Sequence, residues 1–191
     1  MNTWRVVCAP NGTVTHEAAE LARLIAVTLP RGGTLYFQRG RHRIVASRGR
    51  APGRWEPQPA NRLAIPANID LRFESGAILE PLVPLDVAGQ VRAKGQRIFD
   101  ISQSGLLRLD VRANPRLDVR WWGVLETLDA DHAAAGRINP PPRENAARLR
   151  DLLYSVRPGH TVIFAPGMYD LDLRATGPLQ LVPGVRYHGA H

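Results

Sequence analysis

Two segments of the chain carry mostly apolar residues at the spacing of an amphipathic helix. In residues 16–28 and 144–156 they recur at positions i, i+3, i+4 and i+7, which places them on one face. They are Leu21, Leu24, Ile25 and Thr28 in the first segment, and Leu149, Leu152, Leu153 and Val156 in the second. Pro and Gly residues follow both segments and end the helical pattern. We therefore predict two helices, the first with Thr13 or Thr15 as its N-cap.

A short strand of the same pattern follows each predicted helix. Residues 34–37 (TLYF) match residues 161–164 (TVIF), Gly40 matches Gly167, and Ile44 matches Leu171. Alternate residues of a strand point to the same side, so one side of each strand is expected to face the interior. Alternating segments follow in both copies, with apolar residues at Leu63, Ile65, Ile69, Leu71 and Phe73, and at Leu179, Leu181, Val185 and Tyr187. The chain thus contains one helix–turn–strand unit twice.

The segment between the two copies is predicted to be rich in short strands. Residues 46–62 are rich in Pro, Gly and Arg without periodicity, which predicts a long surface loop. From 76 to 120, short apolar segments alternate with turn residues, which favours stacked strands. A stack of strands needs a cap at its open end, and an amphipathic helix provides one. We predict a mainly β protein with two capping α-helices, in a first unit at 1–120 and a second unit at 121–191.

Composition and charge restrict the class of protein. The 191 residues are 44% hydrophobic, as in globular proteins, and they contain no apolar run long enough to span a membrane. The formal net charge is +8, but the arginines are dispersed and often alternate, as at Arg39, Arg41 and Arg43. Alternation favours the outer face of a strand, either solvated or in contact with an acidic glycan or a partner chain, over specific nucleic-acid binding. The N-terminus lacks a signal-peptide pattern, and Cys8 is expected to be a buried, inert thiol.

Few residues are candidates for chemistry. Asp170 and Asp172 alternate and would share one face of a strand, although a solvated outer face is the preferred interpretation. Asp129 and Asp131 fall in a predicted loop, where Ca²⁺ ligation is a less favoured alternative to solvation. The six histidines show no zinc-ligand spacing, and nucleotide-binding and nucleophile motifs are missing from the sequence. We expect neither a cofactor nor a metal site.

Tryptophans and arginines provide the candidate binding residues. Trp121 and Trp122 have rings that can stack on a sugar, but strand alternation would point one of them inward, so a packing role is preferred. Trp55, in the 46–62 loop, is the better candidate for contact with a glycan or a neighbouring subunit. Arg50 and Arg54 lie beside it in the same loop and complete this set.

The repeated unit resembles the opening segment of the right-handed parallel β-helix proteins of the pectate-lyase superfamily, as found in bacteriophage tailspikes. That family opens with a helix, a Gly-Gly-Thr-Val-Tyr-Phe-Pro-Pro-Gly-x-Tyr-x-Ile strand pair and an Ile-Pro-x-x-Val-x-Leu rung. The matching residues are 32–37 with Gly40 and Ile44, 161–164 with Pro166, Gly167 and Tyr169, and the segments 63–79, 98–100 and 121–124. The chain departs from the family at Gln38-Arg39, where the family has Pro-Pro, and at 125–131, where it has Gly-Asp-Gly-x-x-Asp-Asp-Thr.

The resemblance implies short parallel β-helix units in tandem and a virion structural component, such as the attachment or stem region of a tail or head spike or fibre. It also implies a homotrimer that contacts other virion proteins, supports recognition of anionic host-surface glycans, and is assembled in the host cytoplasm. No catalysis is expected unless the natural chain extends beyond His191, because the family's catalytic residues lie on later rungs. The alternatives are the N-terminal part of a polysaccharide lyase or glycoside hydrolase, with Asp170 or Asp172 in its site, and a nucleic-acid-binding module.

Overall fold

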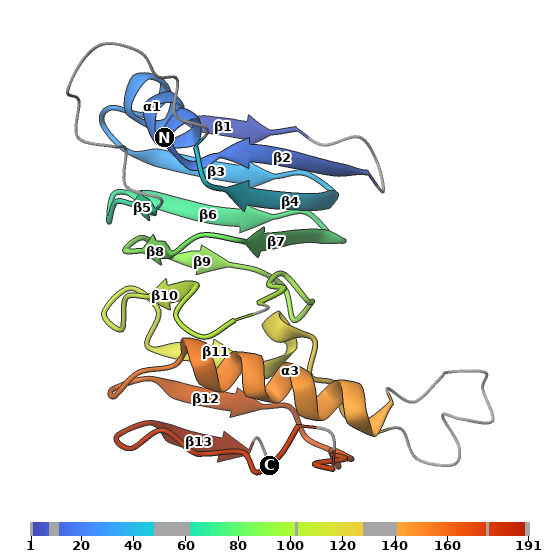
Figure 1. The fold of residues 1–191 in the computed structure, drawn as a ribbon. Helices are drawn as coiled ribbons and strands as arrows, with labels where there is room; N and C mark the ends of the chain where they lie inside the picture. Colours follow the sequence, from blue (N-terminus) through green and yellow to red (C-terminus); the bar gives the residue numbers. More distant parts are fainter. Residues whose placement is uncertain are drawn as a thin grey trace.

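The computed structural model describes residues 2–7, 12–47, 62–101, 103–127, 141–174 and 176–189. These residues form a mainly β structure with two α-helices, in which neighbouring strands of every sheet run parallel (Figure 1). Within the described ranges, neither helix is long and apolar enough to cross a membrane.

The strands belong to four parallel sheets. Sheet A contains β1 (Thr3–Val6), β3 (Gly33–Phe37), β6 (Ile69–Phe73) and β9 (Val91–Arg92). Sheet B contains β2 (Thr13–Glu17), β4 (Gly40–Val45) and β7 (Ala77–Pro81). Sheet C contains β5 (Leu63–Ile65), β8 (Leu85–Val87) and β10 (Leu107–Leu109), and sheet D contains β11 (Arg116–Asp118), β12 (Thr161–Phe164) and β13 (Arg186–Gly189).

The chain visits sheets A, B and C in a fixed order. From β3 it passes to β4 and β5, and from β6 it passes to β7 and β8 before it returns to sheet A at β9. Each pass adds one strand to the same edge of each sheet, so strands from distant parts of the sequence lie side by side. In Figure 1, β11, β12 and β13 continue the column of sheet A, and their arrows point in the same direction.

A buried asparagine ties two of these passes together. The side chain of Asn114, just before β11, accepts a hydrogen bond from the backbone N–H of Val91 (2.8 Å) and donates one to the carbonyl of Gly89 (2.9 Å). Gly89 itself has no room for a side chain, because a Cβ atom there would lie 1.7 Å from the carbonyl oxygen of Ile69. This position therefore requires glycine.

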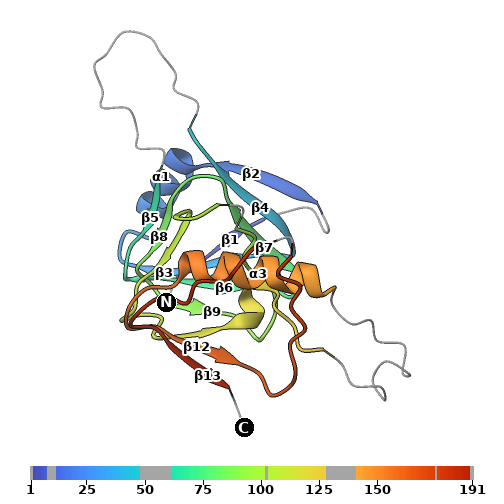
Figure 2. The same ribbon diagram turned by 60° about the horizontal axis from the view of Figure 1, so that its bottom comes forward.

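The two helices cover the two edges of sheet C. Helix α1 (Ala18–Thr28) contacts β5, and helix α3 (Pro142–Ser155) contacts β10, and these are the outer strands of that sheet. Figure 2, turned so that the lower end comes forward, shows α3 and the β12–β13 pair as two separate sides of the stack. A strand edge covered by a helix cannot pair with another chain, so the two helices protect the outer strands of sheet C.

The predicted helical stripes are largely correct. Leu21 and Ile25 of α1 are buried, as are Leu149, Leu152, Leu153 and Val156 in and after α3. Leu24 is only half-buried and Thr28 is exposed, because the last buried position of the first helix is taken by Leu29.

The predicted N-cap of the first helix was wrong. Thr13 and Thr15 belong to β2, and Glu17 occupies the N-cap position without a side-chain cap. A distant residue supplies the hydrogen bond instead: the hydroxyl oxygen of Ser47 accepts one from the backbone N–H of Ala19 at 2.8 Å. The helix begins later than predicted because the residues before it pair with β4.

A column of stacked rings runs through the interior of the strand stack. Apart from Trp121 and Trp122, which share η1, each ring belongs to a different segment of the chain, so the column links the first strands to the segment before α3. Its members and centroid distances are His16–His42 (5.5 Å), His42–Phe37 (5.1 Å), Phe37–Phe73 (5.1 Å), Phe73–Phe99 (6.0 Å), Phe99–Trp122 (5.3 Å) and Trp122–Trp121 (6.4 Å). Stacked and edge-to-face pairs at these distances stabilise a core beyond the area that they bury.

The second copy of the repeat is less complete than the first. Strand β12 forms where predicted, and Gly40 and Gly167 both have positive φ (129° and 141°). However, Ile44 is fully buried in β4, whereas its counterpart Leu171 is 36% exposed and lies outside any strand. Strand β4 pairs on both sides, with β2 and β7, and residues 169–174 have no strand neighbour among the described residues. The predicted alternation at 179–187 is likewise incomplete, and Leu181 is 66% exposed.

The two predicted units share one core. The proposed division between residues 120 and 121 falls inside the 3-10 turn η1 (Val119–Trp122). Buried residues on both sides of it belong to the same hydrophobic cluster, and β11 before the division pairs with β12 after it.

Candidate functional site: a charged cluster between the strands and helix α3

Trp121 and Trp122 belong to the interior. Trp121 is 8% exposed and Trp122 is 1% exposed, in agreement with the preferred packing role. Strand alternation, which would point one ring inward, does not apply, because these residues form η1 and not a strand, and both rings are buried. Asp118 begins this turn by accepting a hydrogen bond from the N–H of Arg120 (2.9 Å), and Gly123 ends it in the left-handed conformation. A sugar does not reach either ring face in this arrangement.

The other three predicted contact residues, Arg50, Arg54 and Trp55, lie outside the described residues. The same applies to Cys8 and to the pair Asp129 and Asp131. Their expected roles stay predictions.

Asp170 and Asp172 do not share the face of a strand, because residues 169–174 are irregular. Asp170 is exposed, and Asp172 accepts a hydrogen bond from the N–H of Arg174 at 3.0 Å. The arrangement matches the preferred interpretation of solvated carboxylates.

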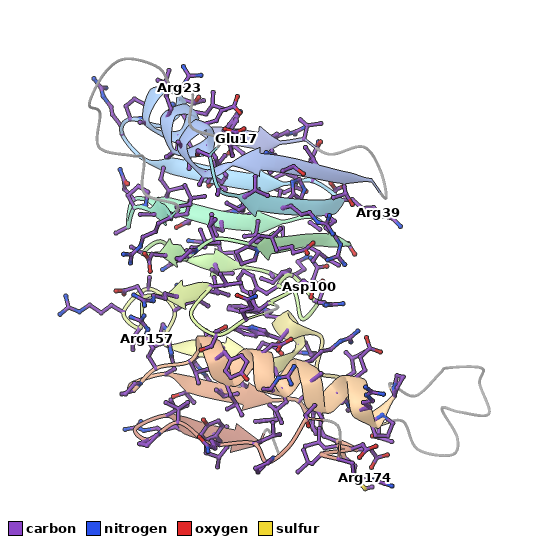
Figure 3. The ribbon with its side chains drawn as sticks, viewed as in Figure 1. Glu17, Arg23, Arg39, Asp100, Arg157 and Arg174 are labelled. Atoms are coloured by element: carbon purple, nitrogen blue, oxygen red, sulfur yellow. The ribbon has the colours of Figure 1, made fainter. Side chains whose placement is uncertain are left out.

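A group of interacting charges among the described residues lies where the strand stack meets α3. Glu80 of β7 pairs with Arg41 and with Arg43 of β4, both at 2.9 Å. Arg43 and Glu80 are directly opposite each other in the β4–β7 register. Asp100 also pairs with Arg41, and with Arg97 at 2.8 Å. Figure 3 labels Asp100 between the strands and α3. We call Arg41, Arg43, Glu80, Arg97 and Asp100, together with Glu144, Arg148, Arg150 and Asp151 of α3, the charged cluster.

Helix α3 contributes the remaining residues of the charged cluster. Arg148 donates a hydrogen bond to the carbonyl of Gly123 (2.7 Å) and pairs with Glu144 one turn earlier. A Cβ atom on Gly123 would lie 2.9 Å from the Cδ of Arg97 and 3.0 Å from Nη1 of Arg148, so both arginine side chains pack on this glycine. Burial lowers the pKa of Arg148, and the neighbouring Arg97 lowers it further.

Asp151 is the unusual acid of the charged cluster. It lies on α3, 3.7 Å from Arg150, with 18% of its side chain exposed. Burial raises its pKa from 3.8 to about 6, Asp100 also raises it, and Arg150 and Arg97 act in the opposite direction. A carboxyl group that titrates near neutral pH can serve as an acid or a base in catalysis, and it also occurs in purely structural networks.

Sequence reasoning found only part of this cluster. The alternation of Arg39, Arg41 and Arg43 correctly predicted outward-facing arginines on a strand for Arg41 and Arg43, whereas Arg39 precedes β4. Glu80, Asp100 and Asp151 come from three other segments, and only the β4–β7 register and the position of α3 bring them near these arginines. Within the described ranges, no group of three or more His, Cys, Asp or Glu side chains is placed to hold a metal ion.

A second group of titratable residues lies near α1. His42 is fully buried, and its Nε2 donates to the carbonyl of Gln38 at 2.7 Å, so its Nδ1 is free to accept from Nε2 of His16 at 3.2 Å. Burial, with a smaller contribution from His42, lowers the pKa of His16 from 6.5 to about 4. Burial also lowers the pKa of His42. Both rings are therefore neutral at pH 7 and serve as members of the ring column.

Comparisons of the chain with protein-family models, curated proteins and solved structures found no match.

Proposed function

We propose that the chain forms short parallel β-helix units and serves as a structural component of a virion spike or fibre, in its attachment or stem region. The fixed order in which the chain visits sheets A, B and C supports a helical winding of the backbone, because each pass adds one strand to each sheet. The resemblance of the repeated unit to the opening segment of tailspike-like proteins supports the virion role.

The observation that carries a structural role is the pairing within the charged cluster. Glu80 and Asp100 each contact two arginines, and Arg41 contacts both acids. Carboxylates held in this way cross-link β4, β7 and the segment before η1. A general base needs a free lone pair directed at its substrate, and two guanidinium partners compete for those lone pairs.

Assembly into a trimer is part of this proposal, and exposed apolar residues indicate where the subunits would meet. Met168 (71% exposed), Leu171, Leu173 and Leu181 (66% exposed) belong to one short segment of the second copy. Leu181 also lines a groove of about 350 Å³ between α3 and residues 176–183. Leu171 and Leu173 lie beside the first turn of α3, and Leu181 lies beside its last turns. Exposed apolar side chains of this kind are typical of surfaces that bind another protein.

Size-exclusion chromatography with light scattering tests this assembly. We expect a trimer for the unmodified chain and a monomer for Leu181→Glu, which places a charge in the apolar segment. The matched control is Val27→Glu, at an apolar residue of α1 with a similar exposed fraction (71%). It should leave the trimer intact. A monomer of the unmodified chain at high concentration would contradict the assembly part of the proposal.

One observation favours the alternative of a polysaccharide lyase or glycoside hydrolase: the raised pKa of Asp151, with Asp100 as a second carboxyl in the same cluster. This alternative predicts cleavage of an anionic polysaccharide by the purified chain, and loss of cleavage in Asp151→Asn and in Asp100→Asn. The Asp170→Asn variant should keep full activity, because Asp170 is exposed and outside the cluster. If a panel of polysaccharides shows no cleavage, the structural role stands.

A further inference from the structure

One outward-facing row of sheet A combines two arginines with a tyrosine. Arg5 of β1 lies opposite Tyr36 of β3, and Tyr36 lies opposite Arg72 of β6. Leu35 and Leu71, next to them in sequence, are fully buried, so the row faces outward. Both arginines are exposed and Tyr36 is half-buried. We call Arg5, Tyr36 and Arg72 the first triplet.

Sheet D repeats this arrangement. Arg116 of β11 lies opposite Thr161 of β12, and Thr161 lies opposite Arg186 of β13. Both arginines are exposed, and the fully buried Val162 next to Thr161 shows that the row faces outward. We call Arg116, Thr161 and Arg186 the second triplet. Each triplet places a hydroxyl group between two guanidinium groups on three successive strands.

The four arginines of the triplets have no ion pair with another described residue. Arg92, which continues the first row on β9, differs from them because it pairs with Asp70 at 3.1 Å. Most arginines in the charged cluster are likewise neutralised by carboxylates. The positive charge of the triplets is therefore available to a partner outside the chain.

The spacing of these charges restricts the kind of partner. Neighbouring strands lie about 4.8 Å apart, so the two arginines of a triplet are separated by about 9.6 Å at the backbone. Because β11, β12 and β13 continue the column of sheet A in Figure 1, the two triplets occupy successive parts of one side. Each strand of a DNA duplex carries a phosphate about every 3.4 Å of helix axis, which is a denser charge than this row of cations. An acidic polysaccharide carries its charges further apart, on every sugar ring or every second one, and offers hydroxyl groups between them.

We propose that this side of the protein binds a linear acidic polysaccharide that runs across the strands, with its anionic groups on Arg5, Arg72, Arg116 and Arg186. Tyr36 and Thr161 meet the intervening sugar hydroxyl groups. This inference rests on the proposed role in attachment to a host surface, and it locates that role on the outer side of sheets A and D.

Binding measurements with defined polymers test the proposal. Binding to polygalacturonate and to heparin is measured at several salt concentrations, with dextran as the neutral polymer and duplex DNA as the rival polyanion. The variants are Arg5→Gln with Arg72→Gln, and Arg116→Gln with Arg186→Gln. The matched control is Arg23→Gln with Arg157→Gln, which removes the same charge from exposed residues elsewhere (Figure 3). Thermal unfolding verifies that each variant folds.

We expect binding to polygalacturonate or heparin at low salt and none to dextran. Each triplet variant should weaken binding roughly tenfold and lower the slope of log K against log salt by up to about two, because two cations are lost. The control should stay within about twofold of the unmodified chain. Equal weakening by the control, stronger binding to duplex DNA, or absence of binding to both acidic polysaccharides would each overturn the proposal. The oligomeric state reports separately on the proposed function: a trimer that binds neither polymer retains the structural role and loses this surface.

Discussion

Replacing Asp151 by asparagine should stabilise the protein above pH 6. The carboxyl has a pKa of about 6 in the folded chain, mainly because of burial, against an ordinary value of 3.8. Between these two pH values the folded state binds more protons than the unfolded state, so stability falls as pH rises through this window. Asparagine has nearly the same shape and does not ionise, so Asp151→Asn removes this loss.

The size of the gain follows from the same numbers. A change from 3.8 to about 6 corresponds to about 3 kcal/mol at 1.36 kcal/mol per pKa unit. Asp151 retains contact with solvent and faces Arg150 at 3.7 Å, so screening and the lost attraction reduce the net gain. We expect Asp151→Asn to be more stable by about 1 kcal/mol at pH 7.5 and equal in stability to the unmodified chain at pH 3.5.

Urea unfolding of both proteins at a series of pH values measures this difference. Subtracting one curve from the other removes the contribution of His16 and other groups that the substitution leaves unchanged. The exposed Asp170 provides the control, because Asp170→Asn should show no comparable rise. A difference that is independent of pH, or a loss of stability in Asp151→Asn at pH 7.5, would refute the argument that burial governs this carboxyl.

Three further predictions concern the core. Phe99→Ala interrupts the ring column and should cost about 3–5 kcal/mol in urea unfolding, whereas the exposed Tyr154→Ala should cost less than about 1 kcal/mol. Asn114→Ala leaves the N–H of Val91 and a neighbouring carbonyl without partners, and about 2–4 kcal/mol should be lost; an unchanged urea midpoint would show that this link is dispensable. The free energy of unfolding should decrease as pH falls from 6.5 to about 4, because in this range His16 is protonated in the unfolded chain and stays neutral in the folded chain. His16→Gln should reduce this acid loss by roughly 1–2 kcal/mol after allowance for screening, and thermal unfolding at pH 4.5 and pH 7.5 measures it.

The candidate site shows where prediction from the sequence ended. Alternation along β4 placed Arg41 and Arg43 on an outer face, because a strand alternates whatever it pairs with. It gave no indication that Glu80 and Asp100 would neutralise them, since these acids come from other passes of the chain. The solvated position of Asp170 was predicted correctly, but the strand that was expected to carry it does not form, because residues 169–174 have no strand neighbour among the described residues.

Local periodicity by itself determined the two helices, the first strands of both copies and their inward-facing residues. These features follow from the way each segment places its own apolar side chains on one face, where they can be buried. It also suggested that helices would cap the strand stack. The tertiary structure alone decided that α1 and α3 cover opposite edges of one sheet, that both Trp121 and Trp122 are buried, and that Arg5, Tyr36 and Arg72 form one row. In parallel sheets, neighbouring residues come from strands tens of positions apart, so the register between passes fixes which charges meet and which stay free.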